Sequence, residues 1–168
     1  GAHQVQLLHR LTLYNVRQKG FNARLDLIGG CNDKYKAYLD SIVEEYALHD
    51  YVVFYGRKSF DFIAEKLRKS HYFIFPSIEP HEGHSNSLTE AMGCGVVPIV
   101  SPAGFNESIC GVSELVIPKI DAKLYADKII DIERNGKWQE LSTYVYKRVL
   151  DNFTQTVVCK KLISYVES

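Results

Sequence analysis

Residues 71–101 read HYFIFPSIEPHEGHSNSLTEAMGCGVVPIVS, and the order of their side chains decides the fold. Two apolar runs, 71–77 and 96–101, flank a polar loop and a segment of small residues with the spacing of a helix. Both runs are nearly continuous in hydrophobicity, which is typical of strands that are buried on both faces. A strand that is followed by a helix and a second strand predicts a parallel pair joined by a right-handed crossover.

The same alternation extends along the whole chain. Short apolar runs that end at Gly, Pro or Ser predict five strands: RLDLIGG (24–30), YVVFYG (51–56), HYFIFPS (71–77), VVPIVS (96–101) and ELVIP (114–118). Helical spacing predicts helices over about 5–16, 35–46, 60–67, 121–133, 136–150 and 154–166, the last with Thr154 as its N-cap. We therefore predict an α/β fold, a Rossmann-like doubly wound parallel sheet, in a single domain that spans residues 1–168.

Composition narrows the range of partners. The 168 residues are 46% hydrophobic, which fits one globular domain, and 20 Lys and Arg residues balance 20 Asp and Glu residues. A chain without net charge is a poor candidate for binding duplex nucleic acid, and its apolar runs are too short to span a bilayer. No C-x-x-C spacing relates the four cysteines, so we expect free thiols in a reducing cytoplasm: Cys31, Cys94, Cys110 and Cys159.

The loop that follows the third predicted strand is the candidate site. In doubly wound folds a ligand lies outside the carboxyl ends of the strands, at a switch point of the strand order. A helix that starts near Ser85 or Asn86 would point its free N–H groups and its positive dipole end into that crevice. Such a helix end suits a phosphate or a diphosphate, and the small residues Ala91, Gly93 and Gly95 would let the helix pack closely on the sheet.

Residues 75–107 carry an ordered set of motifs: Pro76-Ser77, Glu82-Gly83, Leu88-Thr89-Glu90-Ala91-Met92, Gly95, Pro98, Ser101, Gly104 and Glu107. This set resembles the signature of the large retaining glycosyltransferase family with the GT-B fold, which includes sucrose synthases and many bacterial polysaccharide enzymes. Seven residues separate the two glutamates, as in the paired-glutamate motif of that family. Further matches at LDLIGG, VVFYGR and NFTQ…LISYVE extend the resemblance over most of the chain, which would be the C-terminal, nucleotide-sugar-binding domain.

The resemblance implies roles for the two glutamates and for the start of the helix. Glu82 would be the catalytic residue, beside the hydroxyls of the transferred sugar, and Glu90 would accept hydrogen bonds from the ribose hydroxyls. Carboxylates suit neighbouring hydroxyl groups because each offers two acceptor oxygens. Backbone N–H groups would hold the diphosphate at Asn86, Ser87 and Leu88.

The rest of the implied donor site lies in two loops. Gly56 and Arg57 would border the nucleotide base. Gly83, His84 and Ser85 complete the donor-binding loop, although family members often have Phe-Gly or Leu-Pro in place of the His-Ser pair, so we expect this pair to influence which sugar fits. We expect no metal and no cofactor, because a helix dipole and basic side chains can stabilise the departing diphosphate.

The resemblance also indicates parts that lie outside these residues. Family members grip the diphosphate with an Arg and a Lys in a Gly-Arg…Lys-Gly pattern, and Gly1 would stand at or after its last glycine. The N-terminal acceptor domain precedes that pattern, so we expect the 168 residues alone to have no transferase activity. In the family the strand before Gly1 lies between those that match 24–30 and 71–77. We expect a gap there that is filled by another segment, a rearranged sheet or self-association.

The expected partners follow from the same resemblance. They are a nucleotide-sugar donor linked to UDP, GDP or ADP and the N-terminal domain of the same enzyme, with no nucleic acid. We expect the full enzyme in the cytoplasm, where it could associate peripherally with the inner face of the membrane.

Simpler interpretations of the same residues stay open. The run SLTE (87–90) is also a capping box, in which Glu90 would only satisfy backbone donors. Glu82 could be a solvated loop acid, and His84 could be an exposed residue of the rim. The spacing of His81, Glu82 and His84 is poor for zinc, which favours His-Glu-x-x-His on a helix. Other functions to weigh are a sugar-nucleotide epimerase or phosphorylase of related fold and a non-catalytic Rossmann-like nucleotide-binding module.

Overall fold

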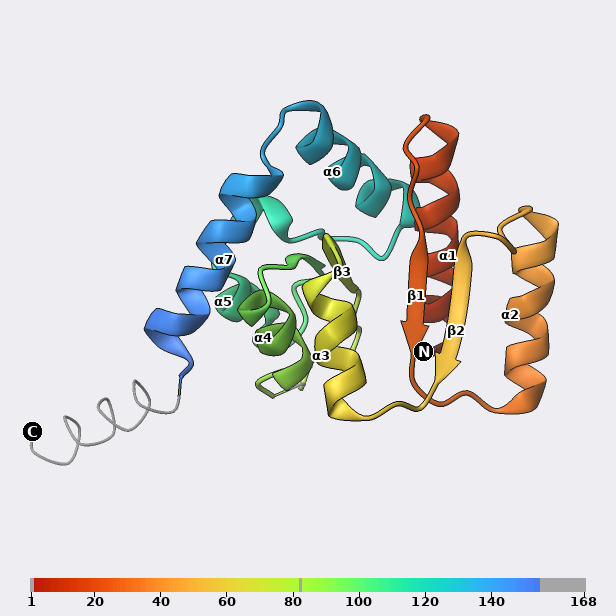
Figure 1. Cartoon of the computed structure of the whole chain (residues 1–168), viewed down its shortest axis with the longest axis horizontal. Coiled ribbons are helices and arrows are strands. Elements are labelled where there is room, and N and C mark those ends of the chain that lie inside the picture. The colour runs from red at the N-terminus through yellow and green to blue at the C-terminus, as the bar shows by residue number, and fades with distance from the viewer. Residues whose placement is uncertain (1, 82, 155–168) are drawn as a thin grey trace, which may run out of the picture.

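The computed structural model describes residues 2–81 and 83–154. Strands and helices alternate along this part of the chain, as Figure 1 shows. The elements are α1 (Ala2–Gln18), β1 (Leu25–Ile28), α2 (Asp33–Glu45), β2 (Val52–Gly56), α3 (Phe60–Arg68), β3 (Tyr72–Phe75), α4 (Asn86–Gly93), β4 (Val97–Val100), α5 (Asn106–Cys110), the 3-10 helix η1 (Ser113–Leu115), α6 (Ala122–Arg134) and α7 (Trp138–Asn152). The α/β fold with parallel strands is confirmed.

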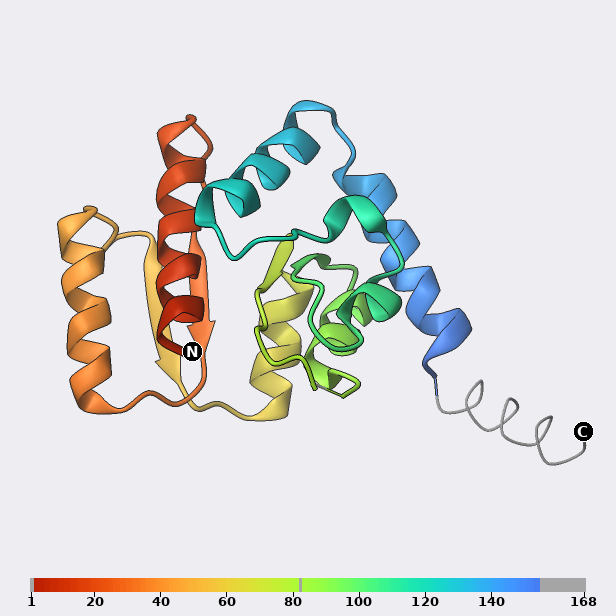
Figure 2. The same cartoon turned by 180° about the vertical axis from the view of Figure 1, so that it is seen from behind.

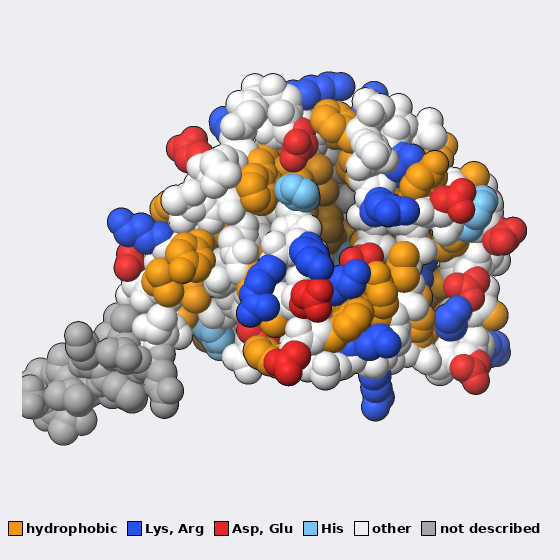
Figure 3. All heavy atoms as spheres, viewed as in Figure 1, with side chains coloured by type: hydrophobic (Ala, Val, Ile, Leu, Met, Phe, Trp, Pro, Cys, Tyr) orange, Lys and Arg blue, Asp and Glu red, His pale blue; other side chains and the backbone are white. Residues whose placement is uncertain are grey.

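The described strands form two parallel pairs instead of one continuous sheet. β1 pairs with β2, and β3 pairs with β4. Within the described ranges no ladder joins β1 to β3, so each of these strands keeps an unpaired edge toward the other pair (Figure 1). This split lies between the strands that match 24–30 and 71–77, where the family resemblance implies a gap. Figure 3 shows that the molecule is hollowed on this face, with hydrophobic side chains in the wall of the hollow.

A histidine covers part of the open edge of β3. The carbonyls of His71 and Phe75 accept the N–H groups of Val97 and Ser101, so these carbonyls point toward β4. Carbonyl directions alternate along a strand, and Ile74 O therefore points away from β4. His9 Nε2 of α1 donates a hydrogen bond to Ile74 O at 2.9 Å. Burial lowers the pKa of the His9 imidazole, which favours the neutral ring.

Helices lie on both faces of the β3–β4 pair, whereas Figure 1 shows none of the described helices in front of β1 and β2. α1, α5 and α6 lie on one face (Figure 2), and α3 and α4 lie on the other (Figure 1). α1 packs against α6, and Thr12 Oγ1 donates to Ala122 O across this contact. Because α1 also packs on β1, these two helices link the two strand pairs.

The hydrophobic core surrounds β4. All four residues of β4 are buried, and the side chains of Leu88, Met92 and Tyr125 that pack around it are fully buried. The residues of β3 are only half-buried, and β1 and β2 contain no fully buried residue. The chain is therefore packed more tightly around β3 and β4 than around β1 and β2.

Two predicted elements differ from the structure. Residues 114–118 do not form a strand: η1 takes up Ser113–Leu115, and only Val116 makes a single parallel bridge, to Val100. Leu115 is fully buried, so the apolar run reflects burial under the core and not a ladder. The predicted helix 154–166 lies, apart from Thr154, outside the described residues.

The cysteines that the structure describes are free thiols. Cys31 and Cys94 are half-buried, and Cys110 is buried, where desolvation raises the pKa of its thiol. Cys159 lies outside the described residues. No described helix has the length and apolar character needed to cross a membrane.

We predict that replacing His9 by leucine lowers the free energy of unfolding by about 1–3 kcal/mol, because the carbonyl of Ile74 would lose its partner. Urea unfolding near neutral pH measures the change. Gln4→Ala is the control, since Gln4 is an exposed residue of the same helix. Equal effects of the two substitutions would contradict the role of His9.

The lowered pKa of His9 also gives this interaction a pH dependence. Below the ordinary histidine pKa of about 6.5 the unfolded chain gains a proton that the folded chain resists. The contribution of His9 is therefore complete above that value and is lost as the pH falls. His9→Gln keeps a donor but does not titrate, so between about pH 7.5 and 5.5 it should lose less stability than the original chain.

Candidate functional site

The candidate site is built on the start of α4. Ser85 has an extended backbone, and its Oγ accepts the N–H of Leu88 at 3.3 Å, so Ser85 is the N-cap of the helix. The buried side chains of Leu88, Ala91 and Met92 fix the rotation of α4 against the core. The predicted helix start near Ser85 or Asn86 is confirmed, and it follows the carboxyl end of β3.

The N-cap does not use all of the backbone N–H groups at the start of α4. Leu88 N–H is engaged by Ser85, and Thr89 N–H donates to Ser85 O. In the described contacts, the N–H groups of Asn86 and Ser87 have no intramolecular acceptor. Of the three predicted diphosphate donors, Asn86 and Ser87 are thus available, whereas Leu88 already has a partner.

Glu90 lies on the outer side of α4. Its side chain is exposed, and it lies five residues after the N-cap Ser85. In a capping box the glutamate lies three residues after the N-cap, so the interpretation of Glu90 as a capping residue paired with Ser87 is wrong. The carboxylate of Glu90 is not engaged with the helix start and can accept hydrogen bonds from a ligand.

His84 is exposed but held in place on α4. Its Nε2 lies 2.8 Å from Thr89 Oγ1, and the Thr89 hydroxyl donates to Ser85 O. The imidazole also contacts the ring of Phe153 at the end of α7, with 5.2 Å between ring centroids. The loop before α4 is therefore anchored to two helices. Gly83 next to His84 is exposed, and a side chain there would meet open space.

Strands β3 and β4 are tied together at the same edge. Ser101 follows β4 and is buried, and its hydroxyl donates to the carbonyl of Ser77, which follows β3. This hydrogen bond joins the ends of the two strands at the base of the loop that leads to α4.

Gly56 and Arg57 lie at the carboxyl end of β2, beside the glycines that follow β1. Gly29 N–H donates to Gly56 O at 2.8 Å. The guanidinium of Arg57 lies over Gly30, where a Cβ would come within 2.8 Å of Arg57 Nε. The structure thus places the Gly56–Arg57 loop at the same edge as the start of α4, on the other side of the split between the strand pairs (Figure 1).

The predicted catalytic residue, Glu82, lies outside the described residues, and so does any metal set that would need it. In the ranges 2–81 and 83–154, no group of three His, Cys, Asp or Glu side chains is arranged as metal ligands would be. His81 is exposed.

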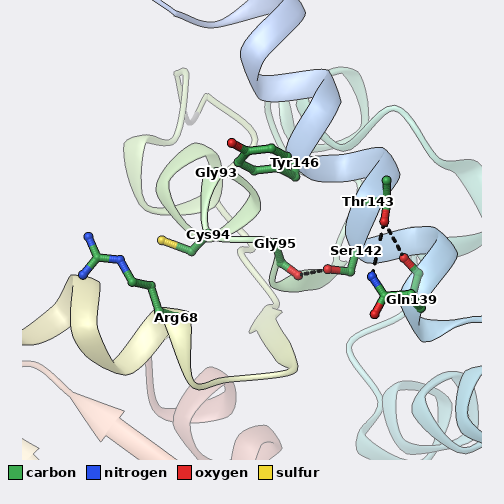
Figure 4. A pocket seen from close by; sticks show the side chains of 8 residues that line it. All are labelled: Arg68, Gly93, Cys94, Gly95, Gln139, Ser142, Thr143 and Tyr146. Carbon is green, nitrogen blue, oxygen red and sulfur yellow. Dashed lines mark hydrogen bonds between the residues drawn. The ribbon is translucent and has the colours of Figure 1, made fainter.

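A separate cavity lies at the opposite end of α4. It has a volume of about 480 Å³ and is lined by Arg68, Gly93, Cys94, Gly95, Gln139, Ser142, Thr143 and Tyr146. Figure 4 shows these residues, with Ser142 Oγ donating to Gly95 O. Because this cavity is at the carboxyl end of α4, far from the open N–H groups, it is not the candidate site.

Comparison with known proteins gives the family. The model of the family described as Glycosyl transferases group 1 matches residues 2–135. The chain belongs to this family of glycosyltransferases. It is 26% identical over 139 residues to the provisionally named colanic acid biosynthesis glycosyltransferase WcaL of Salmonella typhimurium strain LT2, covering 77% of this chain and 34% of that protein.

Solved structures show the same fold. Sucrose-phosphate synthase from Thermosynechococcus elongatus matches with a TM-score of 0.76 and 23% identity, over 95% of this chain and 41% of that one. HepE from Anabaena, solved with UDP, matches with a TM-score of 0.77 and 14% identity, over 93% of this chain and 44% of that one; HepE has also been solved with UDP-glucose. The chain therefore has the α/β fold of GT-B glycosyltransferases and spans less than half the length of these relatives.

Sequence reasoning missed Gly30 as a residue of this edge. The run LDLIGG was assigned to a strand and its turn, and no role was given to the second glycine. The signal available in the sequence was the pair of strands that both end in glycine, Gly29-Gly30 and Gly56, since parallel neighbours bring such ends together.

We predict that Ser85→Ala lowers the free energy of unfolding by about 1 kcal/mol, because Leu88 N–H loses its acceptor at the helix start. Chemical denaturation measures the loss. Ser87→Ala is the matched control, as Ser87 is exposed in the first turn of the same helix. An equal loss in both variants would show that Ser85 is not the cap that starts α4.

Proposed function

We propose that this chain is the donor-binding domain of a retaining glycosyltransferase, which moves a sugar from a nucleotide-sugar to an acceptor such as a glycan, a lipid or a polysaccharide precursor. The observation that carries the proposal is the start of α4: two N–H groups without an acceptor in the described contacts lie at the carboxyl edge of the strands, near an unengaged Glu90. The UDP and UDP-glucose bound by the related fold of HepE support a uridine nucleotide as the donor, and the name of WcaL supports a polysaccharide product.

The helix end has the electrostatics that the reaction needs. The leaving group of sugar transfer is a nucleoside diphosphate, whose negative charge grows as the glycosidic bond breaks. The positive end of a helix dipole and its free N–H groups stabilise such a charge. In the proposed arrangement Asn86 and Ser87 donate to the diphosphate, and Gly83, His84 and Ser85 shape the loop around it. Neither a metal nor a cofactor is required by this chemistry.

The two glutamates would contact different parts of the donor. Glu90 would accept hydrogen bonds from the ribose hydroxyls, for which its exposed carboxylate is available. Glu82 would lie beside the transferred sugar and act in the chemical step. Gly56 and Arg57 would border the nucleotide base.

The whole enzyme is longer in this proposal. The chain spans about a third of the curated relative, and we propose that a further domain supplies the acceptor site and much of the catalytic cleft. The free thiols of Cys31 and Cys94 fit a reducing cytoplasm, with the full enzyme at the inner face of the membrane when its acceptor is lipid-linked. Alone, the 168 residues would bind a donor nucleotide without transferring its sugar.

We predict that UDP, GDP or ADP binds at the start of α4. Two-dimensional NMR titration should shift the amide signals of Asn86 and Ser87 before those of any residue near the cavity of Gly93 and Tyr146. Isothermal calorimetry with the three nucleotides would identify the preferred base. Absence of shifts at millimolar nucleotide, or shifts confined to the opposite end of α4, would contradict the proposal.

We predict that Glu90→Gln weakens donor binding by about tenfold or more, since a charge-assisted hydrogen bond is lost. Glu140→Gln is the control, because Glu140 is an exposed glutamate of α7. In the full-length enzyme Glu82→Gln should lower kcat more than it weakens donor binding. If Glu90→Gln changes only the melting temperature, the ribose contact is wrong.

A further inference from the structure

The loop between β3 and α4 has few buried residues. It runs from Pro76, which is buried after β3, to Ser85, which is buried before α4. The described residues 78–81, 83 and 84 between them are all exposed. A loop without buried side chains keeps one conformation only through contacts at particular points. The position of a residue within this loop, such as the proposed catalytic Glu82, would therefore depend on the contacts that hold the two ends of the loop.

His84 anchors the end of this loop through a hydrogen bond whose direction is fixed. The Thr89 hydroxyl donates its one proton to Ser85 O, at 3.1 Å, so Thr89 Oγ1 can only accept from the imidazole. His84 Nε2, which lies 2.8 Å away, therefore carries a proton and donates it. The neutral ring with a proton on Nε2 and the charged ring both supply this donor, so the hydrogen bond does not depend on the charge of His84.

Phe153 holds the same imidazole from α7, which packs against α4. Its ring centroid lies 5.2 Å from that of His84, and the ring planes are tilted by 59°. Phe153 is itself fixed at the end of α7, because its N–H donates to Val149 O at 2.9 Å. The Arg148 guanidinium lies over the Phe153 ring, 5.9 Å from its centroid, and also donates to Ile109 O of α5. The imidazole thus lies between the first turn of α4 and a fixed ring at the end of α7.

We infer that His84 is a positioning residue for Glu82, and that Thr89 and Phe153 act through His84. This inference rests on the proposed function and deepens it, because it gives His84 a role in the chemical step that needs no contact with the donor. His84 is two residues after Glu82, and two residues span at most about 7 Å. A displacement of the imidazole would therefore displace the catalytic carboxylate as well.

The start of α4 is held by other contacts than those of His84. Ser85 caps the helix, and the buried side chain of Leu88 fixes its rotation. Loss of the His84 contacts should therefore leave the N–H groups of Asn86 and Ser87 in place for the diphosphate. The chemical step should suffer instead, because a misplacement of about 1 Å at a reacting group can cost about 100-fold in rate.

The test separates kcat from donor binding in the full-length enzyme. The reaction is the release of UDP from UDP-glucose with water as the acceptor, and calorimetry gives the affinity for UDP. Thr89→Val removes the acceptor of His84 Nε2, while Ser85 O keeps the backbone N–H of residue 89 as a donor. Thr89→Val and Phe153→Leu should each lower kcat about tenfold or more and change KM and UDP affinity by less than about twofold. Thr89→Ser keeps the hydroxyl and should retain nearly all of the kcat.

Two variants of α7 are the controls. Thr143→Val removes a hydroxyl whose described hydrogen bonds are both with Gln139, and Tyr146→Leu removes an exposed aromatic ring. Both should keep the original kcat. An unchanged kcat in Thr89→Val or Phe153→Leu, or a Thr89→Ser variant as slow as Thr89→Val, would overturn the positioning role. A rise in KM or a loss of UDP affinity as large as the loss of kcat would also overturn it, because His84 would then contact the donor.

A second measurement keeps this inference separate from the proposed function. In the unliganded chain the NMR signals of the His84 ring protons should shift in Phe153→Leu, and the Nε2–H signal should shift in Thr89→Val. Both should stay unchanged in Thr143→Val. If the original enzyme releases no UDP, the proposed function and the catalytic part of this inference fail together. In that case shifted His84 signals still support its placement between Thr89 and Phe153, and unshifted signals overturn it.

Discussion

The hydrogen bond from Leu88 N–H to Ser85 Oγ determines where α4 begins, and the candidate site depends on that position. The buried side chain of Leu88 fixes the rotation of α4 about its own axis. With start and rotation fixed, Asn86 and Ser87 are the residues whose N–H groups lack acceptors in the described contacts, and Glu90 faces outward. A cap two residues later would have used Glu90 to satisfy the backbone and left no carboxylate for a ligand.

The same type of junction follows β1, β2 and β3, whereas α5, which follows β4, begins without a side-chain cap. Asn32 after β1 and Ser59 after β2 are N-caps that accept the N–H groups of Tyr35 and Phe62. Parallel strands end at one edge, so three capped helix starts and their short loops lie there together. The register of β1 against β2 shifts after Leu27, which pairs Ile28 with Gly56. Beyond this shift Gly29 N–H donates to Gly56 O, so the loops that follow β1 and β2 begin beside each other.

Most of the fold could be predicted from the sequence because its strands are short apolar runs that end in turn residues, although only β4 is fully buried. The run at 114–118 shows the limit of that signal. Leu115 is as buried as the residues of β4, but burial alone does not distinguish a strand from a 3-10 turn under the core. The split between the strand pairs was expected from the resemblance to known enzymes, not from the residues themselves.

At the site, helix start and loop could be predicted, whereas contacts between loops could not. Ser85 and Ser87 are both reasonable caps in the sequence, and only the direction of the buried Leu88 decides between them. The contact of Arg57 with Gly30 depends on the direction of a long side chain between two loops, which composition and periodicity do not indicate. His84 and Phe153 are far apart in the chain, so their contact follows from tertiary packing alone.

Because the sheet is split, the proposed donor site lies between the β1–β2 pair and the β3–β4 pair. Arg57 and Gly30 belong to the β1–β2 pair, and α4 belongs to the β3–β4 pair. No strand ladder within the described residues couples these pairs, so helix packing and connecting loops alone resist their relative motion. A nucleotide that contacts both strand pairs would restrict their motion relative to each other. Part of its binding free energy would be spent on the motional entropy that the two pairs lose when they are held together.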